Sequence, residues 1–244
     1  MIDGIFAREW GPSRAAKGGE QTNAGANPDW ESLRMLMVAE QIRKRGIRSP
    51  KVLTAMERVP RHLFVPEELA ARSYNDEPVP IGERQTISQP YMVAAMTEAL
   101  ELEGNERVLE IGAGSGYQAA ILGELAREVI TIEARAALAD AARERLAKLG
   151  YTNVRVVTGD GTHGWVEGAP FDAILVAAAA PQVPAPLIEQ LAEGGRMVIP
   201  VGKSDRQMLT RIRKCGGHIV QEQLFLCQFV PLQGEHGWPA SPTE

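Results

Sequence analysis

The amino-acid sequence predicts an α/β protein with a doubly wound, mostly parallel sheet, and two observations carry this prediction. Between residues 90 and 201, short apolar runs alternate with segments of helical length, which is typical of right-handed strand–helix–strand crossovers. Three of the apolar runs lead to an acidic residue: Glu110, Glu133 and Asp160. Because open parallel sheets bind ligands at the carboxyl ends of their strands, this pattern also predicts a ligand site at that edge.

Two helices are predicted before this core. Apolar residues recur at helical spacing over 31–45, and Gly46 is a typical stop for that helix. Ser49 and Pro50 suit the N-cap and the first turn of a second helix, which ends before Pro60.

The core elements follow in a regular order, and a hairpin is expected after them. Two strands, at 208–213 and 219–230, flank a pair of glycines and predict that hairpin at one edge of the sheet. The expected core elements are helices at 90–102, 116–126, 135–149 and 184–192, and strands at 107–111, 129–132, 154–158, 172–177 and 196–201.

The chain is expected to form a single domain over 31–233. Within it, 31–90 is a region of helices and loops, and 91–233 is the α/β core. Residues 1–30 show no sustained periodicity and are expected to be a mobile N-terminal extension, and 234–244 a C-terminal tail.

The composition narrows the class of protein. With 44% hydrophobic and 23% charged residues, the chain has the make-up of an ordinary soluble globular protein. Its net charge of −5 supplies no overall field for nucleic acid or an anionic membrane, so neither is an expected partner. The two cysteines and four histidines lack metal-site spacing, so no metal is expected. Neither a signal sequence nor an apolar run of ~20 residues is visible, and the expected compartment is the cytoplasm.

A glycine-rich turn follows the strand at 107–111. Gly112, Gly114 and Gly116 allow a tight turn and a close approach of backbone to a ligand, because no Cβ stands in the way. The following helix then directs its free N–H groups at the turn. A purely structural alternative is that these glycines only permit close packing of helix on strand.

The residues around this turn distinguish two nucleotide cofactors. A dinucleotide fingerprint has a third glycine where this chain has Tyr117, which weakens the case for a nicotinamide-dependent oxidoreductase. Glu110 precedes the turn, and its carboxylate would repel a pyrophosphate but suits a ligand with an ammonium or sulfonium cation. The pattern resembles motif I of S-adenosylmethionine-dependent methyltransferases.

Two further strand ends extend the predicted site. Glu133 is placed to accept hydrogen bonds from ribose hydroxyls, although a carboxylate that favours a helix N-terminus would look the same. Asp160 can accept a bond from an adenine amino group while Gly161 keeps the backbone clear, although Gly-Asp-Gly is also a good turn.

A polar segment at 80–91 precedes the first core helix and is expected to be a loop. The simplest interpretation is that Ser88 or Gln89 caps that helix. A nucleophilic role for Ser88 has no support, because no G-x-S-x-G elbow or paired His and Asp accompany it.

The sequence Gln-Thr-Ile-Ser-Gln-Pro-Tyr at 85–91 resembles the signature of protein-L-isoaspartate O-methyltransferases. Similar matches occur at 58–66, at 170–174 and at 229–232, and the resemblance covers roughly residues 32–233. The signature at 85–91 is far more specific than motif I, which many methyltransferases share.

This resemblance implies a Rossmann-like class I methyltransferase fold and a protein repair reaction. A methyl group moves from S-adenosylmethionine to the α-carboxylate of an L-isoaspartyl residue in damaged proteins and peptides, and the ester forms a succinimide that partly returns to aspartate. It places 31–90 on the substrate side, makes Ser88 the active-site residue, and favours a monomer. The implied cofactor-binding residues are Gln85, Thr86, Ile87, Ser88, Glu110, Gly112, Ala113, Gly114, Gly116, Glu133, Asp160 and Gly161.

One residue departs from the family pattern, and two further alternatives remain open. Gln228 stands where an arginine often precedes Phe-Val-Pro-Leu, so substrate affinity is expected to differ. The alternatives are a methyltransferase acting on a small molecule or RNA, and a module that binds the cofactor without catalysis.

Overall fold

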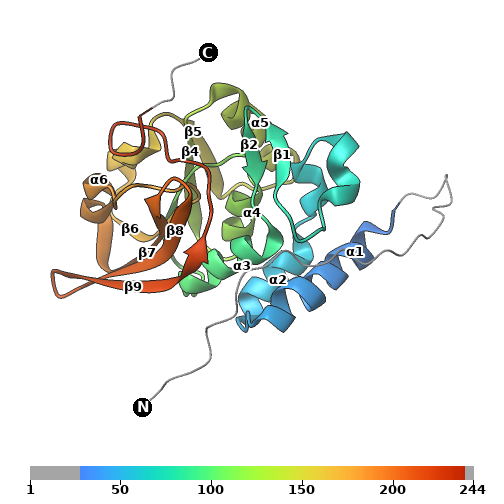
Figure 1. Ribbon diagram of the computed structural model, residues 1–244, viewed down its shortest axis with the longest axis horizontal. Helices are drawn as coiled ribbons and strands as arrows, with labels where there is room; N and C mark the ends of the chain where they lie inside the picture. Colours follow the sequence, from blue (N-terminus) through green and yellow to red (C-terminus); the bar gives the residue numbers. More distant parts are fainter. Residues whose placement is uncertain (1–27, 240–244) are drawn as a thin grey trace.

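The computed structural model describes residues 28–239 and contains a seven-stranded sheet of order β5-β4-β3-β6-β7-β8-β9 (Figure 1). Strands β3 to β7 run parallel, and β8 and β9 are antiparallel additions at one edge. The predicted doubly wound, mostly parallel sheet is therefore confirmed. The strands are Arg107–Ile111 (β3), Glu128–Glu133 (β4), Val154–Thr158 (β5), Phe171–Val176 (β6), Leu191–Lys203 (β7), Arg206–Cys215 (β8) and His218–Cys227 (β9).

Apolar side chains cover both faces of the sheet and form two core clusters. In β3, Val108 belongs to the cluster under the helices, whereas Leu109 and Ile111 belong to the cluster on the other face. Helices cover the first face in layers, and α6 with short irregular segments covers the second. The helices of the core are Pro90–Ala99 (α3), Tyr117–Gly123 (α4), Ala136–Lys148 (α5) and Ala185–Glu189 (α6).

Helix α6 is shorter than the predicted helix at 184–192. The backbone N–H of Phe171 donates to the Gln190 carbonyl at 2.9 Å, and Phe171 pairs with Leu191 in the sheet. This pairing draws the chain into β7 five residues before the predicted strand at 196–201, because a buried ladder satisfies backbone groups that the helix end leaves open.

The predicted N-terminal helices are present. Helix α1 (Trp30–Met37) continues through a π-helical turn (Val38–Ile42) and a 3₁₀ turn (Arg43–Arg45) to Gly46, whose φ of 108° is left-handed. Helix α2 (Pro50–Arg58) is capped by the Ser49 side chain, as predicted. Two 3₁₀ helices follow, at Arg61–Phe64 and Glu67–Arg72.

The segment at 80–91 is not the predicted loop. It begins as an antiparallel hairpin of β1 (Val79–Gly82) and β2 (Gln85–Ile87), in which the buried Val79 lies opposite Ile87. Burial of these two apolar side chains ties the strands together despite the prolines nearby. The turn places Glu83 and Arg84 at φ values of 50° and 55°, in the left-handed region that favours glycine.

The prediction that Ser88 or Gln89 caps α3 is also wrong. Gln89 occupies the N-cap position, but no side chain accepts a hydrogen bond from the first turn of the helix. The Gln89 amide instead donates to Asp76 Oδ1 at 3.0 Å. The Ser88 side chain therefore does not cap the helix.

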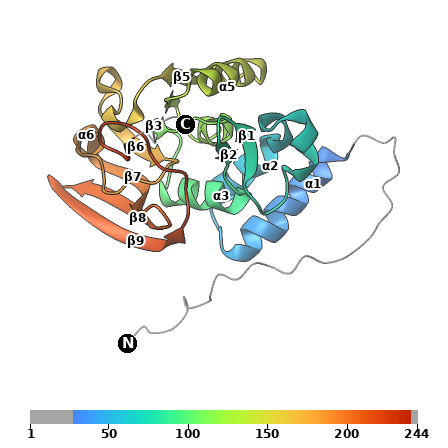
Figure 2. The same ribbon diagram turned by 45° about the horizontal axis from the view of Figure 1, so that its top comes forward.

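The predicted C-terminal hairpin is confirmed, with Gly216 and Gly217 at φ values of 60° and 75° in its turn. Strand β9 ends at Cys227, three residues earlier than predicted. Residues 228–232 leave the sheet and run beside the β1–β2 hairpin in both ribbon views (Figures 1 and 2). No helix in 28–239 has the length and apolar character needed to span a bilayer.

Candidate active site

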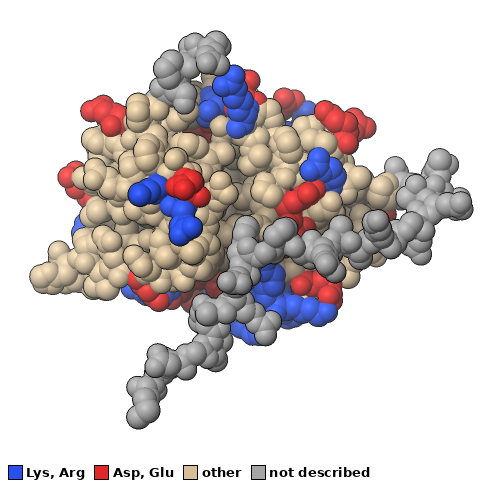
Figure 3. Space-filling view, viewed as in Figure 1, with Lys and Arg blue, Asp and Glu red and all other residues tan. Residues whose placement is uncertain are grey.

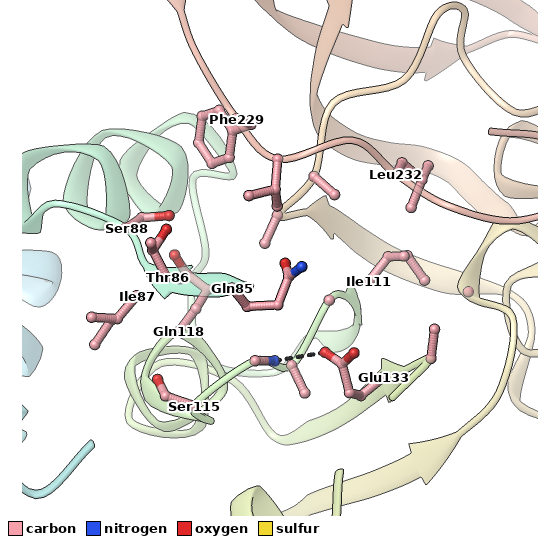
Figure 4. A pocket seen from close by; sticks show the side chains of 18 of the residues that line it. Gln85, Thr86, Ile87, Ser88, Ile111, Ser115, Gln118, Glu133, Phe229 and Leu232 are labelled. Carbon is pink, nitrogen blue, oxygen red and sulfur yellow. Dashed lines mark hydrogen bonds between the residues drawn. The ribbon is translucent and has the colours of Figure 1, made fainter. Parts of the chain in front are cut away.

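A cleft opens at the carboxyl ends of β3, β4 and β6, where three segments distant in the sequence converge (Figure 4). The glycine turn forms its floor, the β2 strand one wall, and residues 229–233 the opposite wall. Nine of the twelve predicted site residues line it: Gln85, Thr86, Ile87, Ser88, Gly112, Ala113, Gly114, Glu133 and Gly161. The predicted ligand edge of the sheet is thus a cleft in the structure.

Glu133 joins the glycine turn to the neighbouring strand. One carboxylate oxygen accepts a hydrogen bond from the Gly114 N–H at 2.8 Å, and the other accepts from the Arg135 N–H at 3.0 Å (Figure 4). The side chain is buried yet lines the cleft. Each carboxylate oxygen has a second lone pair, so the group can hold the turn and still accept bonds from a ligand.

Gly116 begins helix α4 and does not line the cleft. Its φ is 87°, and a Cβ at this position would lie 3.3 Å from Leu146 Cδ1 of α5. The packing interpretation therefore fits Gly116, whereas Gly112 and Gly114 border the cleft.

Glu110 lies behind the cleft. It is fully buried, faces the helical layer beside Thr131, and neither carboxylate oxygen has a hydrogen-bond partner among the described residues. Burial raises the pKa of Glu110 to about 8, and the nearby Glu133 carboxylate adds to this shift. In the unliganded protein the neutral form of Glu110 therefore predominates at pH 7.

Asp160 follows the end of β5 by two residues and does not line the cleft. Its Oδ1 accepts bonds from the Thr162 N–H and hydroxyl at 2.8 and 2.7 Å, and its Oδ2 accepts from the Glu235 N–H at 2.9 Å. Burial opposes ionisation, but these bonds outweigh it and hold the pKa of Asp160 below its usual value. The carboxylate caps a short 3₁₀ helix and anchors the C-terminal segment, while the neighbouring Gly161 borders the cleft.

Ser88 stands at the junction of β2 and α3. Figure 4 shows its side chain above Thr86, with Phe229 next above it at the start of the wall formed by residues 229–233. The Ser88 hydroxyl makes no hydrogen bond to another described residue, whereas its backbone carbonyl accepts a bond from Arg61 Nη2 at 2.7 Å. The hydroxyl is thus a free donor at the mouth of the cleft.

Several cleft residues escaped the sequence analysis. Ser115 lies within the glycine turn, and Tyr117 and Gln118 begin α4, so that all three line the cleft; this placement could have been inferred from the turn itself. Arg135, which follows the predicted Glu133, also lines it. The first two residues of the wall at 229–233 were assigned to the predicted strand at 219–230, and nothing in residues 228–230 themselves signals that the chain leaves the sheet there.

The hydrogen-bonding groups that line the cleft suit an organic ligand with polar groups. Within residues 28–239, no cluster of three or more His, Cys, Asp and Glu side chains could hold a metal ion. Basic and acidic side chains are interspersed over the face shown in Figure 3.

Comparisons with known proteins point to one family. A family model described as protein-L-isoaspartate(D-aspartate) O-methyltransferase matches residues 34–237. The protein-L-isoaspartate O-methyltransferase of Syntrophus aciditrophicus is 56% identical over 212 residues, covering 86% of this chain and 97% of the relative. The protein of the same name from Methanoculleus marisnigri is 54% identical over 202 residues, covering 83% and 92%.

Solved structures agree with these relatives. One protein-L-isoaspartate O-methyltransferase superposes with a TM-score of 0.74 and 30% identity, over 85% of this chain and 67% of that chain. A Plasmodium falciparum protein-L-isoaspartate O-methyltransferase, crystallised with S-adenosyl-L-homocysteine, superposes with a TM-score of 0.72 and 27% identity, over 82% and 98%.

Proposed function

The chain belongs to the protein-L-isoaspartate(D-aspartate) O-methyltransferase family, and we propose that Ser88 orients the substrate carboxylate that accepts the methyl group. The enzyme moves a methyl group from S-adenosylmethionine to the free α-carboxylate of L-isoaspartyl residues in damaged proteins and peptides. The single observation that supports the role of Ser88 is its free hydroxyl beside the glycine turn, in one cleft.

The cofactor side of the cleft consists of the glycine turn and Glu133. The backbone at Gly112 and Gly114 allows close approach of the methionine portion, and the carboxylate of Glu133 suits the ribose hydroxyls. Gly161 leaves room for the adenine. When bound, the cofactor supplies a methyl group on an activated sulfonium.

The substrate needs little chemical help from the protein. An isoaspartyl carboxylate has an ordinary pKa near ~4 and is already an anion at neutral pH, so no general base is required. Alignment of the reacting atoms can supply about 7–11 kcal/mol of the barrier. We assign that alignment to the Ser88 hydroxyl, which donates a hydrogen bond to the carboxylate and forms no covalent bond.

A neutral donor suits this task better than a cation. The carboxylate loses its negative charge as the ester forms, so a lysine or arginine in direct contact would hold the ground state more strongly than the transition state. The hydroxyl of Ser88 orients the anion and stabilises the ground state less than a cation would.

We further propose the setting in which the enzyme works. The regions 31–90 and 91–233 supply the substrate and cofactor sides of a single domain, and the protein acts as a monomer in the cytoplasm. Its net charge of −5 supports the expectation that neither nucleic acid nor a membrane is a partner.

A methyl-transfer assay on a matched pair of peptides tests the reaction. We expect label from S-adenosylmethionine on a peptide with L-isoaspartate, in a base-labile ester, and none on the same peptide with L-aspartate. Label on both peptides would contradict the substrate assignment. Absence of label with intact cofactor binding would support the alternative of a binding module.

Glu133→Ala should weaken cofactor binding about 10- to 100-fold, because hydrogen bonds to a charged group contribute roughly 1.5–3 kcal/mol. Calorimetric titration with S-adenosylhomocysteine measures the change in Kd. Glu128→Ala, at the opposite end of the same strand, is the matched control and should leave Kd unchanged. An equal effect of the two substitutions would contradict a specific role for Glu133.

A further inference from the structure

Arg61 is a fully buried arginine that the methyl-transfer chemistry described above does not use. It begins the 3₁₀ helix that follows Pro60, and no carboxylate in residues 28–239 forms an ion pair with it. A guanidinium stays charged in proteins, and burial of a charge without an opposite charge is costly. The contacts that hold Arg61 must therefore offset that cost.

Those contacts are two backbone carbonyls and an aromatic ring. Arg61 Nε donates to the Ser73 carbonyl at 2.6 Å, and Nη2 donates to the Ser88 carbonyl at 2.7 Å. The guanidinium carbon lies 4.8 Å from the centre of the Tyr117 ring, which borders the cleft. One rigid fork thus joins a surface segment, the active-site serine and a wall of the cofactor cleft.

The contact to Ser88 falls where the chain has little other local support. Ser88 lies after the last residue of β2, and the first turn of α3 lacks a side-chain cap. The bond to the Ser88 carbonyl restricts rotation about ψ and so limits the direction of the Cα–Cβ bond, which leaves χ1 as the main freedom of the hydroxyl.

We propose that Arg61 is a positioning residue for methyl transfer, which holds the Ser88 carbonyl and thereby aims the Ser88 hydroxyl at the isoaspartyl carboxylate. This inference rests on the proposed role of Ser88. The inference also gives a reason for burying a charge. Arg61 acts on the substrate only through the main chain of Ser88 and does not contact the substrate directly.

The fork geometry explains why arginine is suited to this position. A guanidinium is planar and presents donors at fixed angles, so that it can satisfy two carbonyls at once. A lysine would retain the charge but has a single flexible ammonium. Arg61→Lys therefore separates geometry from charge.

A double-mutant cycle with Ser88 tests the proposal. Arg61→Lys is expected to lower kcat for an isoaspartyl peptide by about 10²-fold, the effect of misplacing a reacting group by about 1 Å. In a Ser88→Ala background, the same change should lower kcat less than about twofold, because no hydroxyl remains to be aimed. The Kd for S-adenosylhomocysteine should stay unchanged in both.

Arg34→Lys is the matched control. Arg34 Nε also donates to a backbone carbonyl, that of Glu57, but Arg34 belongs to α1 and does not line the cleft. This variant should keep the wild-type kcat. Equal losses from Arg61→Lys in the two Ser88 backgrounds would overturn the proposal and indicate a general structural role. Wild-type activity of Ser88→Ala alone would overturn the proposed function first.

A second measurement applies if Arg61→Lys does not fold. An ester in place of the Ser88–Gln89 peptide bond weakens the Ser88 carbonyl as an acceptor and leaves every side chain in place. We expect a lower kcat with an unchanged circular dichroism spectrum. Wild-type kcat in this analogue would also overturn the proposal.

Discussion

Ser88→Ala should lower kcat/KM for an isoaspartyl peptide by about 10²-fold and leave the fold intact. We expect a fall of this magnitude in kcat/KM because the reacting carboxylate loses its alignment. The side chain is half-buried and its hydroxyl bonds no other described residue, so removal leaves no unpaired partner in the protein. Steady-state kinetics with thermal unfolding separates the two effects.

Two companion measurements make this result specific. Ser88→Thr keeps the hydroxyl and should retain more activity than the alanine variant, and the Kd for S-adenosylhomocysteine should be the same in both. Incubation of the enzyme with labelled cofactor, in the absence of peptide, should leave no label on the protein, because the serine forms no covalent intermediate. Wild-type turnover in Ser88→Ala would refute the role.

The alternation of strands and helices was the part of the fold that the sequence predicted best. Most core strands are apolar runs with defined ends, and such runs are stable only where both faces of the strand are buried; β7, whose first half contains glycines and charged residues, is the exception. The hairpin of β1 and β2 was missed because proline, glycine and polar residues interrupt its few apolar positions. It forms since Val79 and Ile87 are buried together, and a contact of this kind depends on the surrounding tertiary structure.

The three acidic strand ends were predicted to act together, and the structure gives them different surroundings. Glu133 lines the cleft, Asp160 holds the C-terminal segment, and Glu110 faces the helical layer. Sequence order identifies which residues end the strands. It does not tell which face of the sheet the helices cover, and so could not predict that Glu110 is enclosed.

The C-terminal wall of the cleft shows a second limit. The sequence Gln-Phe-Val at residues 228–230 is compatible with a strand. In the structure, however, the Phe229 N–H donates to the Gln207 side chain at 2.9 Å. A side chain from the neighbouring strand thus ends the ladder. Long-range contacts of this type leave no local pattern in the sequence.

Glu110→Gln should make the stability of the protein less dependent on pH. The pKa of Glu110 is about 8 in the native state, against an ordinary value of 4.5 for a glutamate. Between these values the unfolded state ionises while the native state holds its proton, so native stability falls as pH rises. The loss amounts to about 4 kcal/mol between pH 5 and pH 8 and ends above the native pKa. Glutamine is neutral throughout, so this contribution disappears.

Urea unfolding from pH 5 to pH 9 measures the effect as the difference in unfolding free energy between variant and wild type. That difference should grow in favour of Glu110→Gln up to about pH 8 and then level off. Thr131→Val is the matched control: it keeps the titrating group and should keep the fall in stability with pH, which should extend to higher pH because the Thr131 hydroxyl lowers the pKa of Glu110. A difference independent of pH would show that Glu110 is already ionised in the native protein.

The same proton offers a test of whether Glu110 takes part in cofactor binding. If the ammonium of the methionine portion acts on Glu110, as its place before the glycine turn predicts, binding favours the ionised carboxylate and releases a proton near pH 7. Calorimetric titration with S-adenosylhomocysteine in two buffers of different ionisation enthalpy counts that proton. We expect its release from wild type and from Thr131→Val, and none from Glu110→Gln. Equal proton release from all three proteins would separate Glu110 from the cofactor and leave it a buried acid of the core.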